Sequence, residues 1–254
     1  MEDQQEVSFE SMSRANSIVA DVLELMEEKV KPGINTKKLD SIAEEYIRDQ
    51  GATPAFKGYR GYPGTINASI NEQIVHGIPS EQQIVAEGDL LSLDVGACYN
   101  GCYGDSAFTI AVEPLSPTAR QLLDVTRRAL YRAISEVKPG VRLGVVCNAI
   151  ESFVKPYGFS VVREWAGHFI GHQMHMEPQI PNYGSPDWGP ILKPGMYMAI
   201  EPMVNVGAAP TKILSDGWTV VTKDGSLSAH FEHTIAVVED GVKVLSRRSK
   251  EVLM

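Results

Sequence analysis

The chain lacks the features that mark secreted and membrane proteins. It has only three cysteines, Cys98, Cys102 and Cys147, which cannot all pair. This number argues against a disulfide scaffold, and a reducing compartment is expected. No segment approaches the roughly 20 consecutive apolar residues of a membrane span. The first six residues are acidic and have neither the cationic start nor the apolar stretch of a signal peptide. We therefore expect a cytoplasmic protein that does not contact a membrane.

Basic surface is also scarce. The chain has 23 Lys and Arg against 32 Asp and Glu, a net charge of −9, and no run of basic residues. Binding to a phosphate backbone needs clustered Lys and Arg, so no nucleic-acid partner is expected. The remaining composition is that of an ordinary globular protein, with 43% hydrophobic and 22% charged residues. A sizeable core is therefore possible.

The second half of the sequence repeats the first at a constant offset of 107 in the numbering. The segment Val-Lys-Pro-Gly at 30–33 returns at 137–140, and the same offset carries Asp94 onto Glu201. An acid at equivalent points of both halves indicates a site between them, built around metal ions. We therefore predict one catalytic domain, residues 1–254, made of two duplicated halves at about 8–112 and 116–240.

Each half begins with helical spacing and continues with β-rich sequence. Apolar residues recur at helical intervals, and Thr36 and Ser116 stand where helix caps belong. The expected helices cover about 8–30, 36–47, 116–139 and 143–157, and the β-rich segments cover 84–112 and 195–238. This order predicts an α+β fold of pseudo-twofold symmetry, with antiparallel hairpins covered on one side by two pairs of helices.

A tight hairpin brings two aspartates together. The dipeptide Asn-Gly at 100–101 favours a two-residue turn, which makes Asp94 face Ala107 and places Asp105 on the same face. Such diagonal neighbours lie roughly 7–8 Å apart. The strand around Asp94 is apolar, and a buried carboxylate needs a compensating partner. For a single aspartate a turn cap or a surface ion pair is the alternative, but for this pair a divalent cation is expected.

The second half supplies further acids and a histidine cluster. Glu201 ends an apolar strand, whereas Asp105 and Glu232 are offset by 127 and not by 107, which implies an insertion in the second hairpin that contains Trp218. Three of the six histidines fall within 168–175. An imidazole among four carboxylates suits Mn, Fe, Co or Zn better than Mg or Ca. Strand alternation turns His233 away from Glu232, which favours a structural role for His233.

Taken together, these segments resemble the type I methionine aminopeptidases, subfamily A of peptidase family M24, which have the pita-bread (creatinase/aminopeptidase) fold. The resemblance extends from about residue 10 to residue 248. The matching segments are Ser69-Ile70-Asn71-Glu72, His76-Gly77-Ile78-Pro79, the Asp94/Asp105 hairpin, Gly167-His168, His175 with Glu177-Pro178, Ile200-Glu201-Pro202-Met203, Asp216-Gly217-Trp218 and Glu232-His233-Thr234.

The resemblance implies a site with two divalent metal ions of the Co, Mn, Fe or Zn kind. Asp94 would bind one ion, Asp105 and Glu232 would bridge both, and His168 and Glu201 would bind the second. The implied reaction is removal of the N-terminal methionine from nascent proteins and peptides, with a small second residue preferred, by a hydroxide that bridges the metals.

The family also implies catalytic and substrate-binding roles. Glu201 would transfer the proton, whereas His175 and His76 would contact the scissile amide and the substrate amine. The implied substrate-binding set is His76, His175, Tyr59, Tyr62, Met174 and Trp218. The partners implied are peptide and nascent-chain N-termini, with proximity to the ribosome, and we expect a monomer.

Three residues depart from the family pattern, and two other functions fit the fold. Phe169 replaces a usual Gly, Met174 a usual Phe and Val75 a frequent Cys, so the pocket mouth and the specificity are expected to differ. One alternative is an Xaa-Pro-type peptidase, although such relatives carry a long N-terminal domain. The other is a non-catalytic pita-bread protein that binds RNA or protein, although such proteins lose metal ligands.

Overall fold

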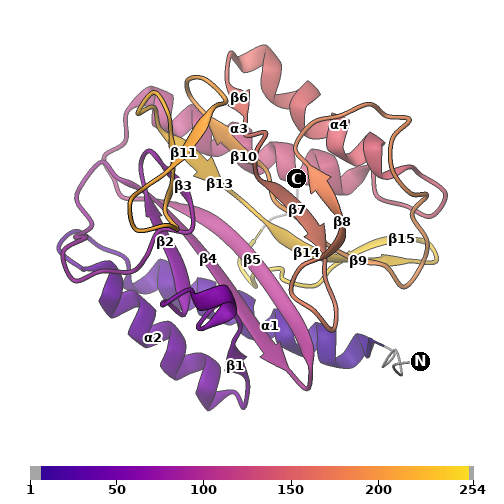
Figure 1. Cartoon of the computed structure of the whole chain (residues 1–254), viewed down its shortest axis with the longest axis horizontal. Helices are drawn as coiled ribbons and strands as arrows, with labels where there is room; N and C mark the ends of the chain where they lie inside the picture. The colour runs from indigo at the N-terminus through magenta and orange to yellow at the C-terminus, as the bar shows by residue number, and fades with distance from the viewer. Residues whose placement is uncertain (1–6, 252–254) are drawn as a thin grey trace.

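The computed structural model describes residues 7–251 and contains four α-helices in two pairs (Figure 1). The helices are α1 (Phe9–Lys29), α2 (Thr36–Asp49), α3 (Pro117–Ser135) and α4 (Leu143–Val154), with short 3-10 turns η1 (Tyr59–Gly61) and η2 (Lys155–Tyr157). All four lie close to the expected ranges. The cap of α2 differs from the expectation, because Asn35 and not Thr36 accepts a hydrogen bond from Lys38 N. The Thr36 hydroxyl instead donates to Ser80 O.

Two antiparallel sheets form the centre of the molecule. In the first, β4 pairs with β1, β2 and β5, and in the second the order is β15-β14-β9-β7-β8. Two small sheets, β13-β10-β6 and β11-β12-β3, accompany them. The strands are β1 (Thr53–Pro54), β2 (Ile66–Ile70), β3 (Gln73–Val75), β4 (Leu90–Tyr99), β5 (Cys102–Ala111), β6 (Ser160–Val161), β7 (Ala166–Phe169), β8 (Met176–Pro181), β9 (Tyr197–Ile200), β10 (Met203–Asn205), β11 (Thr211–Ile213), β12 (Val220–Thr222), β13 (Ser228–His230), β14 (His233–Val238) and β15 (Gly241–Val244).

The β4–β5 hairpin has the predicted register. Tyr99 pairs with Cys102 across the turn, and Asp94 faces Ala107. The turn residue Asn100 has a φ of 50° and Gly101 one of 74°, the left-handed pair that a type I′ turn requires. The two aspartates therefore project from the same face, as the sequence predicted.

Equivalent backbone features recur in both halves. Isolated β-bridges join Asn35 to Ile84 and Arg142 to Ile191, and the second bridge follows the first at the same offset of 107. Gly88 N donates to Val112 O and Gly195 N to Val237 O. These last two acceptors are offset by 125, so the second hairpin is the longer one.

This register corrects one expectation about the repeat. At an offset of 125, the position equivalent to Asp105 is His230, and the position equivalent to Glu232 is Ala107. Asp94 and Glu201 are thus matched acids, whereas Asp105 and Glu232 are not. The backbones of the two halves therefore match more closely than the acidic side chains of the site do.

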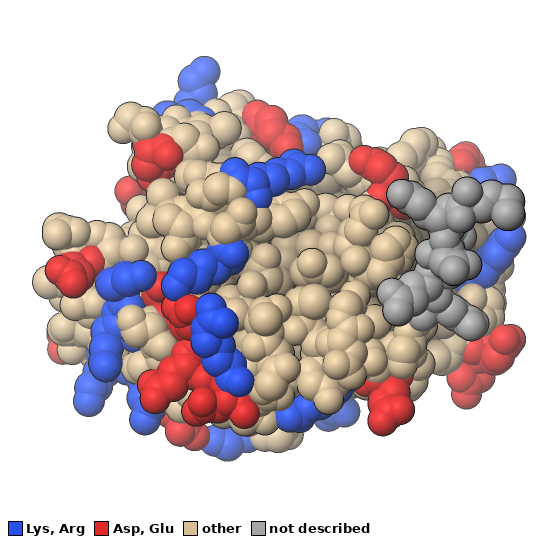
Figure 2. All heavy atoms as spheres, turned by 60° about the horizontal axis from the view of Figure 1, so that its bottom comes forward, with Lys and Arg blue, Asp and Glu red and all other residues tan. Residues whose placement is uncertain are grey.

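One hydrophobic core joins the two halves. A single cluster contains buried residues from all four helices and from strands of both main sheets. In Figure 1, α1 and α2 lie beside the strands of the first half and α3 and α4 beside those of the second. No helix among residues 7–251 is long and apolar enough to cross a membrane. On the face seen in Figure 2, acidic and basic side chains lie next to one another and form no continuous basic surface.

Candidate metal centre

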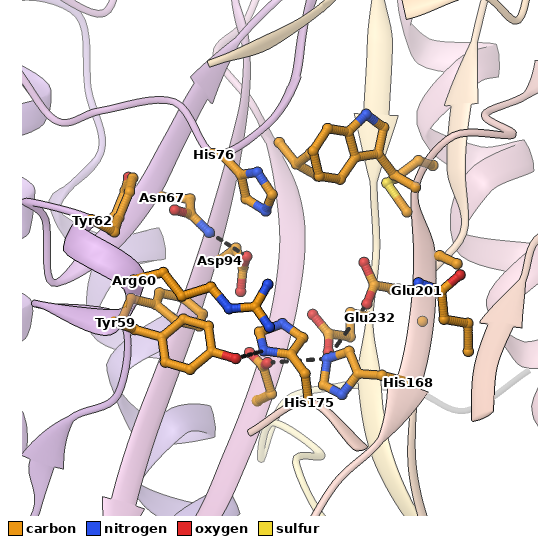
Figure 3. Close-up of a pocket in the computed structure, with 18 of the residues that line it drawn as sticks. Tyr59, Arg60, Tyr62, Asn67, His76, Asp94, His168, His175, Glu201 and Glu232 are labelled. Atoms are coloured by element: carbon orange, nitrogen blue, oxygen red, sulfur yellow. Dashed lines mark hydrogen bonds and ion pairs between the residues drawn. The ribbon is translucent and has the colours of Figure 1, made fainter. Parts of the chain in front are cut away.

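Five potential metal ligands converge between the two main sheets, and four of them, Asp94, His168, Glu201 and Glu232, are labelled in Figure 3. Asp94 comes from β4 and Asp105 from β5, while His168 comes from β7. Glu201 follows the last residue of β9, and Glu232 precedes the first residue of β14. Strands of both halves therefore position the group, as the repeat predicted.

The distances within this group fit a cation site. Asp105, His168 and Glu232 each offer a ligand atom, and these atoms lie within 4.8 Å of one another. The Nε2 atom of His168 is 3.7 Å from Asp105 Oδ2 and 3.7 Å from Glu201 Oε1. Asp94 Oδ1, Asp105 Oδ1 and Glu232 Oε1 are buried and have no hydrogen-bond partner among the described residues. Oxygens left unpaired in this way need a ligand that the chain itself does not supply.

The protonation of the group points to the same conclusion. Burial raises the pKa of Asp94 to about 6 and that of Glu201 to about 8. Burial and then the neighbouring carboxylates raise the pKa of Asp105 and Glu232 well above the usual range. These four acids cannot all ionise at once without a compensating charge. Divalent cations would supply that charge and stabilise the carboxylates. The residues present therefore fit a metal centre.

His168 presents a nitrogen lone pair to the carboxylates. Its Nδ1 is 3.0 Å from Phe169 O, a contact that only the Nδ1–H tautomer makes as a donor. Burial, followed by the proximity of His175, lowers the pKa of His168 to about 3. The ring is therefore neutral, with Nε2 free to bind a metal ion.

Two polar residues at the centre were not predicted from the sequence. Asn67 donates to Asp94 Oδ2 over 2.6 Å, and the register places the two residues opposite each other. His230, only 1% exposed, has its Nε2 3.6 Å from Glu201 Oε2 and no hydrogen-bond partner there. Strand alternation could have found His230, because it lies two residues before Glu232 on the same face.

A cavity of about 480 Å³ opens onto the carboxylates, a size suited to a small organic ligand or a peptide end. Its polar side is the ligand group, and its other side is largely aromatic. Tyr62 and Trp218 meet edge to face with ring centroids 5.1 Å apart, and Tyr59 lies beside them in the same cluster. These three predicted pocket residues all line the cavity.

The two expected non-ligand histidines also line this cavity. His175 Nδ1 is 3.0 Å from the Tyr59 hydroxyl, and its ring lies 4.3 Å from that of His168. His76 has a φ of 59° and packs edge to face against Trp165, another residue that the sequence did not single out. Burial lowers the pKa of His76 to about 4, so this ring is neutral and can accept a hydrogen bond.

The three residues that depart from the family pattern lie in different surroundings. Val75 lines the cavity. Met174, 2% exposed, lies in the cluster of Phe56 and Tyr62 and is not among the cavity-lining residues, so it supports the wall from behind. Phe169 packs into the main core, because it follows His168 on the strand and points to the opposite face. The expected effect of Phe169 on the pocket mouth is thus not supported.

His233 lies away from the ligand group. Its Nδ1 is 2.9 Å from Ser246 Oγ and its Nε2 is 3.2 Å from Glu251 Oε1. Glu251 also accepts hydrogen bonds from Tyr131 and Arg248. The contacts of His233 therefore join β14 to the C-terminal segment, the structural role that strand alternation favoured.

A carboxylate and imidazole centre, an adjoining aromatic cavity and a two-halved α+β fold define the class as a metal-dependent enzyme. Comparison with protein families gives the particular group, because residues 10–239 match the metallopeptidase family M24. The chain belongs to this family. A methionine aminopeptidase of Bacillus subtilis (strain 168) is 51% identical over 236 residues, which cover 93% of this chain and 95% of that one.

Solved structures show the same architecture. Methionine aminopeptidase from Thermotoga maritima superimposes with a TM-score of 0.93 at 43% identity, covering 94% of this chain and 96% of that chain. Prolidase from Pyrococcus furiosus superimposes with a TM-score of 0.77 at 22% identity, covering 98% of this chain but 67% of the prolidase. The pita-bread fold is common to both, while the near-complete match in length is with the aminopeptidase.

Proposed function

We propose that this protein is a metal-dependent methionine aminopeptidase, which removes the N-terminal methionine from peptides and newly made proteins and favours a small second residue. The observation that carries the proposal is the aromatic cavity beside the five potential ligands. A methionine side chain needs an apolar recess next to the reacting amide, and thioethers make favourable contacts with aromatic rings. Tyr59, Tyr62 and Trp218 provide those rings.

Two divalent ions of the Mn, Fe, Co or Zn kind are proposed as cofactors. Asp94 would hold one, His168 and Glu201 the other, and Asp105 and Glu232 both. Bound there, the ions would supply a water molecule that ionises near neutral pH and would polarise the substrate carbonyl. The mixed oxygen and nitrogen donors support this group of metals over Mg or Ca.

Glu201 is proposed to move the proton. It is the ligand-group acid whose pKa burial raises to about 8, and its two oxygens face His168 and His230. An acid placed so can accept a proton from the attacking water and return it to the leaving amine. Its position at the end of β9, and not within a strand, directs it toward the cavity.

His175 and His76 are proposed to bind the substrate. The Nδ1 of His175 faces the Tyr59 hydroxyl, so its Nε2 is left for the developing oxyanion of the scissile amide. The neutral ring of His76 can accept a hydrogen bond from the substrate amine. Together they would hold the first peptide bond over the carboxylates.

Peptide cleavage by metal-free protein, reloaded with each divalent ion in turn, tests the proposal. Met-Ala-Ser and Ala-Pro-Ser distinguish the two activities that share this fold. We expect methionine to be released from the first peptide and nothing from the second. Cleavage of Ala-Pro-Ser alone would identify an Xaa-Pro peptidase, and cleavage of neither with any ion would support a non-catalytic role.

A further inference from the structure

Arg60 is the only Lys or Arg among the described residues that line the cavity. It lies in η1 with a φ of 50°, a left-handed conformation that disfavours every residue with a side chain except Asn and Asp. In Figure 3 its side chain extends from η1 across the cavity beside His175. An arginine is therefore kept at a strained position from which it reaches the entrance of the site.

The guanidinium of Arg60 makes no ion pair with any residue from 7 to 251. It lies 5.4 Å from the ring centroid of Tyr59, and the residue is exposed. The turn beneath it is fixed, because Gly58 N donates to Tyr62 O over 2.8 Å and Gly61 N to Gly58 O over 3.1 Å. The backbone that carries Arg60 is thus fixed, while the guanidinium remains free for a ligand.

The surroundings of Arg60 are otherwise acidic. Six carboxyl groups line the same cavity: those of Asp94, Asp105, Glu164, Glu177, Glu201 and Glu232. Arg60 and His175 line the same part of the cavity, where Figure 3 shows their side chains next to each other. A peptide whose first amide lay at His175 would therefore place its following residues within reach of Arg60.

Given the proposed function, we infer that Arg60 is a specificity-determining residue that binds a substrate carboxylate carried by the third residue of the peptide. A guanidinium presents two parallel N–H donors to a carboxylate, a geometry that lysine cannot reproduce. The carboxylate can be the side chain of an acidic third residue or the C-terminus of a tripeptide. The two carboxylates would bind the guanidinium in the same way, and different peptides distinguish them.

The test compares two pairs of peptides that differ only in this charge. Met-Ala-Glu-amide against Met-Ala-Gln-amide probes the side chain, and Met-Ala-Ser against Met-Ala-Ser-amide probes the C-terminus. Assays use the full chain at a Mn²⁺ concentration shown by calorimetry to saturate each variant. We expect the parent to favour the charged member of a pair about two- to fivefold in kcat/KM, the range for an exposed ion pair, mainly through KM.

Variants assign the preference to Arg60. Arg60→Gln should reduce the ratio to about 1 for any pair in which the parent shows a preference, and Arg60→Lys should retain part of it. Lys57→Gln is the matched control, since Lys57 pairs with Glu44 at 2.6 Å, is not a lining residue and makes the same change in net charge. It should keep the parent ratio. At high salt the parent preference should disappear, because screening weakens exposed pairs.

Three results would overturn the assignment. One is a parent that shows no preference in either pair, and another is a ratio unchanged in Arg60→Gln. The third is an equal loss in Lys57→Gln, which would indicate the general field of the molecule and not a contact. If the parent cleaved none of the four peptides, the aminopeptidase function itself would be refuted, and this assignment with it.

Discussion

At the scale of single residues, Asp94 and Glu201 are equivalent in the repeat but differ in their surroundings. Asp94 accepts a hydrogen bond from Asn67, which favours its charged form. Glu201 faces the imidazoles of His168 and His230 at 3.7 and 3.6 Å. The pKa of Glu201 rises to about 8 and that of Asp94 only to about 6. Two matched acids are thereby suited to different tasks, a fixed ligand and a group that exchanges a proton.

Removing one shared ligand should separate metal binding from folding. In Asp105→Asn or Glu232→Gln we expect divalent affinity to fall more than about 100-fold, since even changes to groups behind the ligands cost 10–100-fold. The metal-free variants should be at least as stable as the parent. Burial opposes the ionisation of these two acids, which costs unfolding free energy near neutral pH, and the uncharged amide has no such cost. Calorimetric titration and thermal unfolding measure the two effects. A variant that binds Mn²⁺ as tightly as the parent would contradict the assigned ligands.

The stability of the metal-free protein should fall as pH rises from about 6.5 to 8. Glu201 keeps its proton in the folded state up to a pKa of about 8, against 4.5 when unfolded. Over this interval the folded state binds more protons, so each such group lowers the unfolding free energy by up to about 1.4 kcal/mol per pH unit.

Histidines oppose this trend only at lower pH. The pKa values of His76, His168 and His230 are lowered from 6.5 to between about 3 and 4 in the folded state. Their contribution to the unfolding free energy is therefore lost as pH falls below 6.5 and is constant above that pH. Thermal unfolding of metal-free protein at pH 6.5, 7.2 and 8 measures the slope, which should be shallower in Glu201→Gln. A parent whose stability rises across this interval would refute the assigned protonation.

At the scale of elements, the sequence predicted what depends on nearby residues. The four helices and the Asp94–Ala107 register follow from apolar spacing and from the Asn-Gly turn. Contacts between distant segments were not predicted. Asn67 faces Asp94 only because β2 joins β4, and Arg60 lines the cavity only because η1 lies beside it. Neither of these contacts between distant segments produces a periodic pattern in the sequence.

Close contact between α1 and β5 depends on Gly104. A Cβ added there would lie 2.7 Å from backbone atoms of Ala15 and Asn16, which cannot move aside without shifting the helix. Gly104→Ala should therefore cost about 1–3 kcal/mol of unfolding free energy, as overpacking commonly does. Urea unfolding measures the loss. Gly171→Ala is the control, because its Cβ would meet only side-chain atoms, of which the nearest belongs to Val7 at 3.1 Å, and an equal loss there would contradict the explanation.

At the scale of the whole molecule, the proposed ligands come from both halves while the core is shared. The repeat in the sequence predicted a site between two halves, and the common cluster shows that they pack on each other. What the repeat could not give was the identity of the facing acids, because the longer second hairpin shifts the equivalence of Asp105 to His230. The insertion itself contains Trp218, which lines the cavity.

The shared core predicts one cooperative unfolding transition. All three tryptophans, Trp165, Trp188 and Trp218, lie in the second half. Their fluorescence reports that half and, through Trp165 and Trp218, its contacts with the first half, whereas far-UV circular dichroism reports the helices of both halves. We expect the two signals to give the same midpoint in urea, with and without Mn²⁺. Midpoints that differ reproducibly would show that the halves unfold separately, and would refute the single domain proposed.

The placement of the ligands on both sides of this junction has a consequence for the lifetime of the protein. A cation bound by Asp94 and Asp105 on one side and by His168, Glu201 and Glu232 on the other, as proposed, would add its binding free energy to that of folding, by RT ln(1 + [M]/Kd). Proteases degrade the unfolded fraction, so this fraction sets the rate of loss. The supply of free metal in the surroundings would then govern how much of the protein accumulates as well as how fast each molecule works.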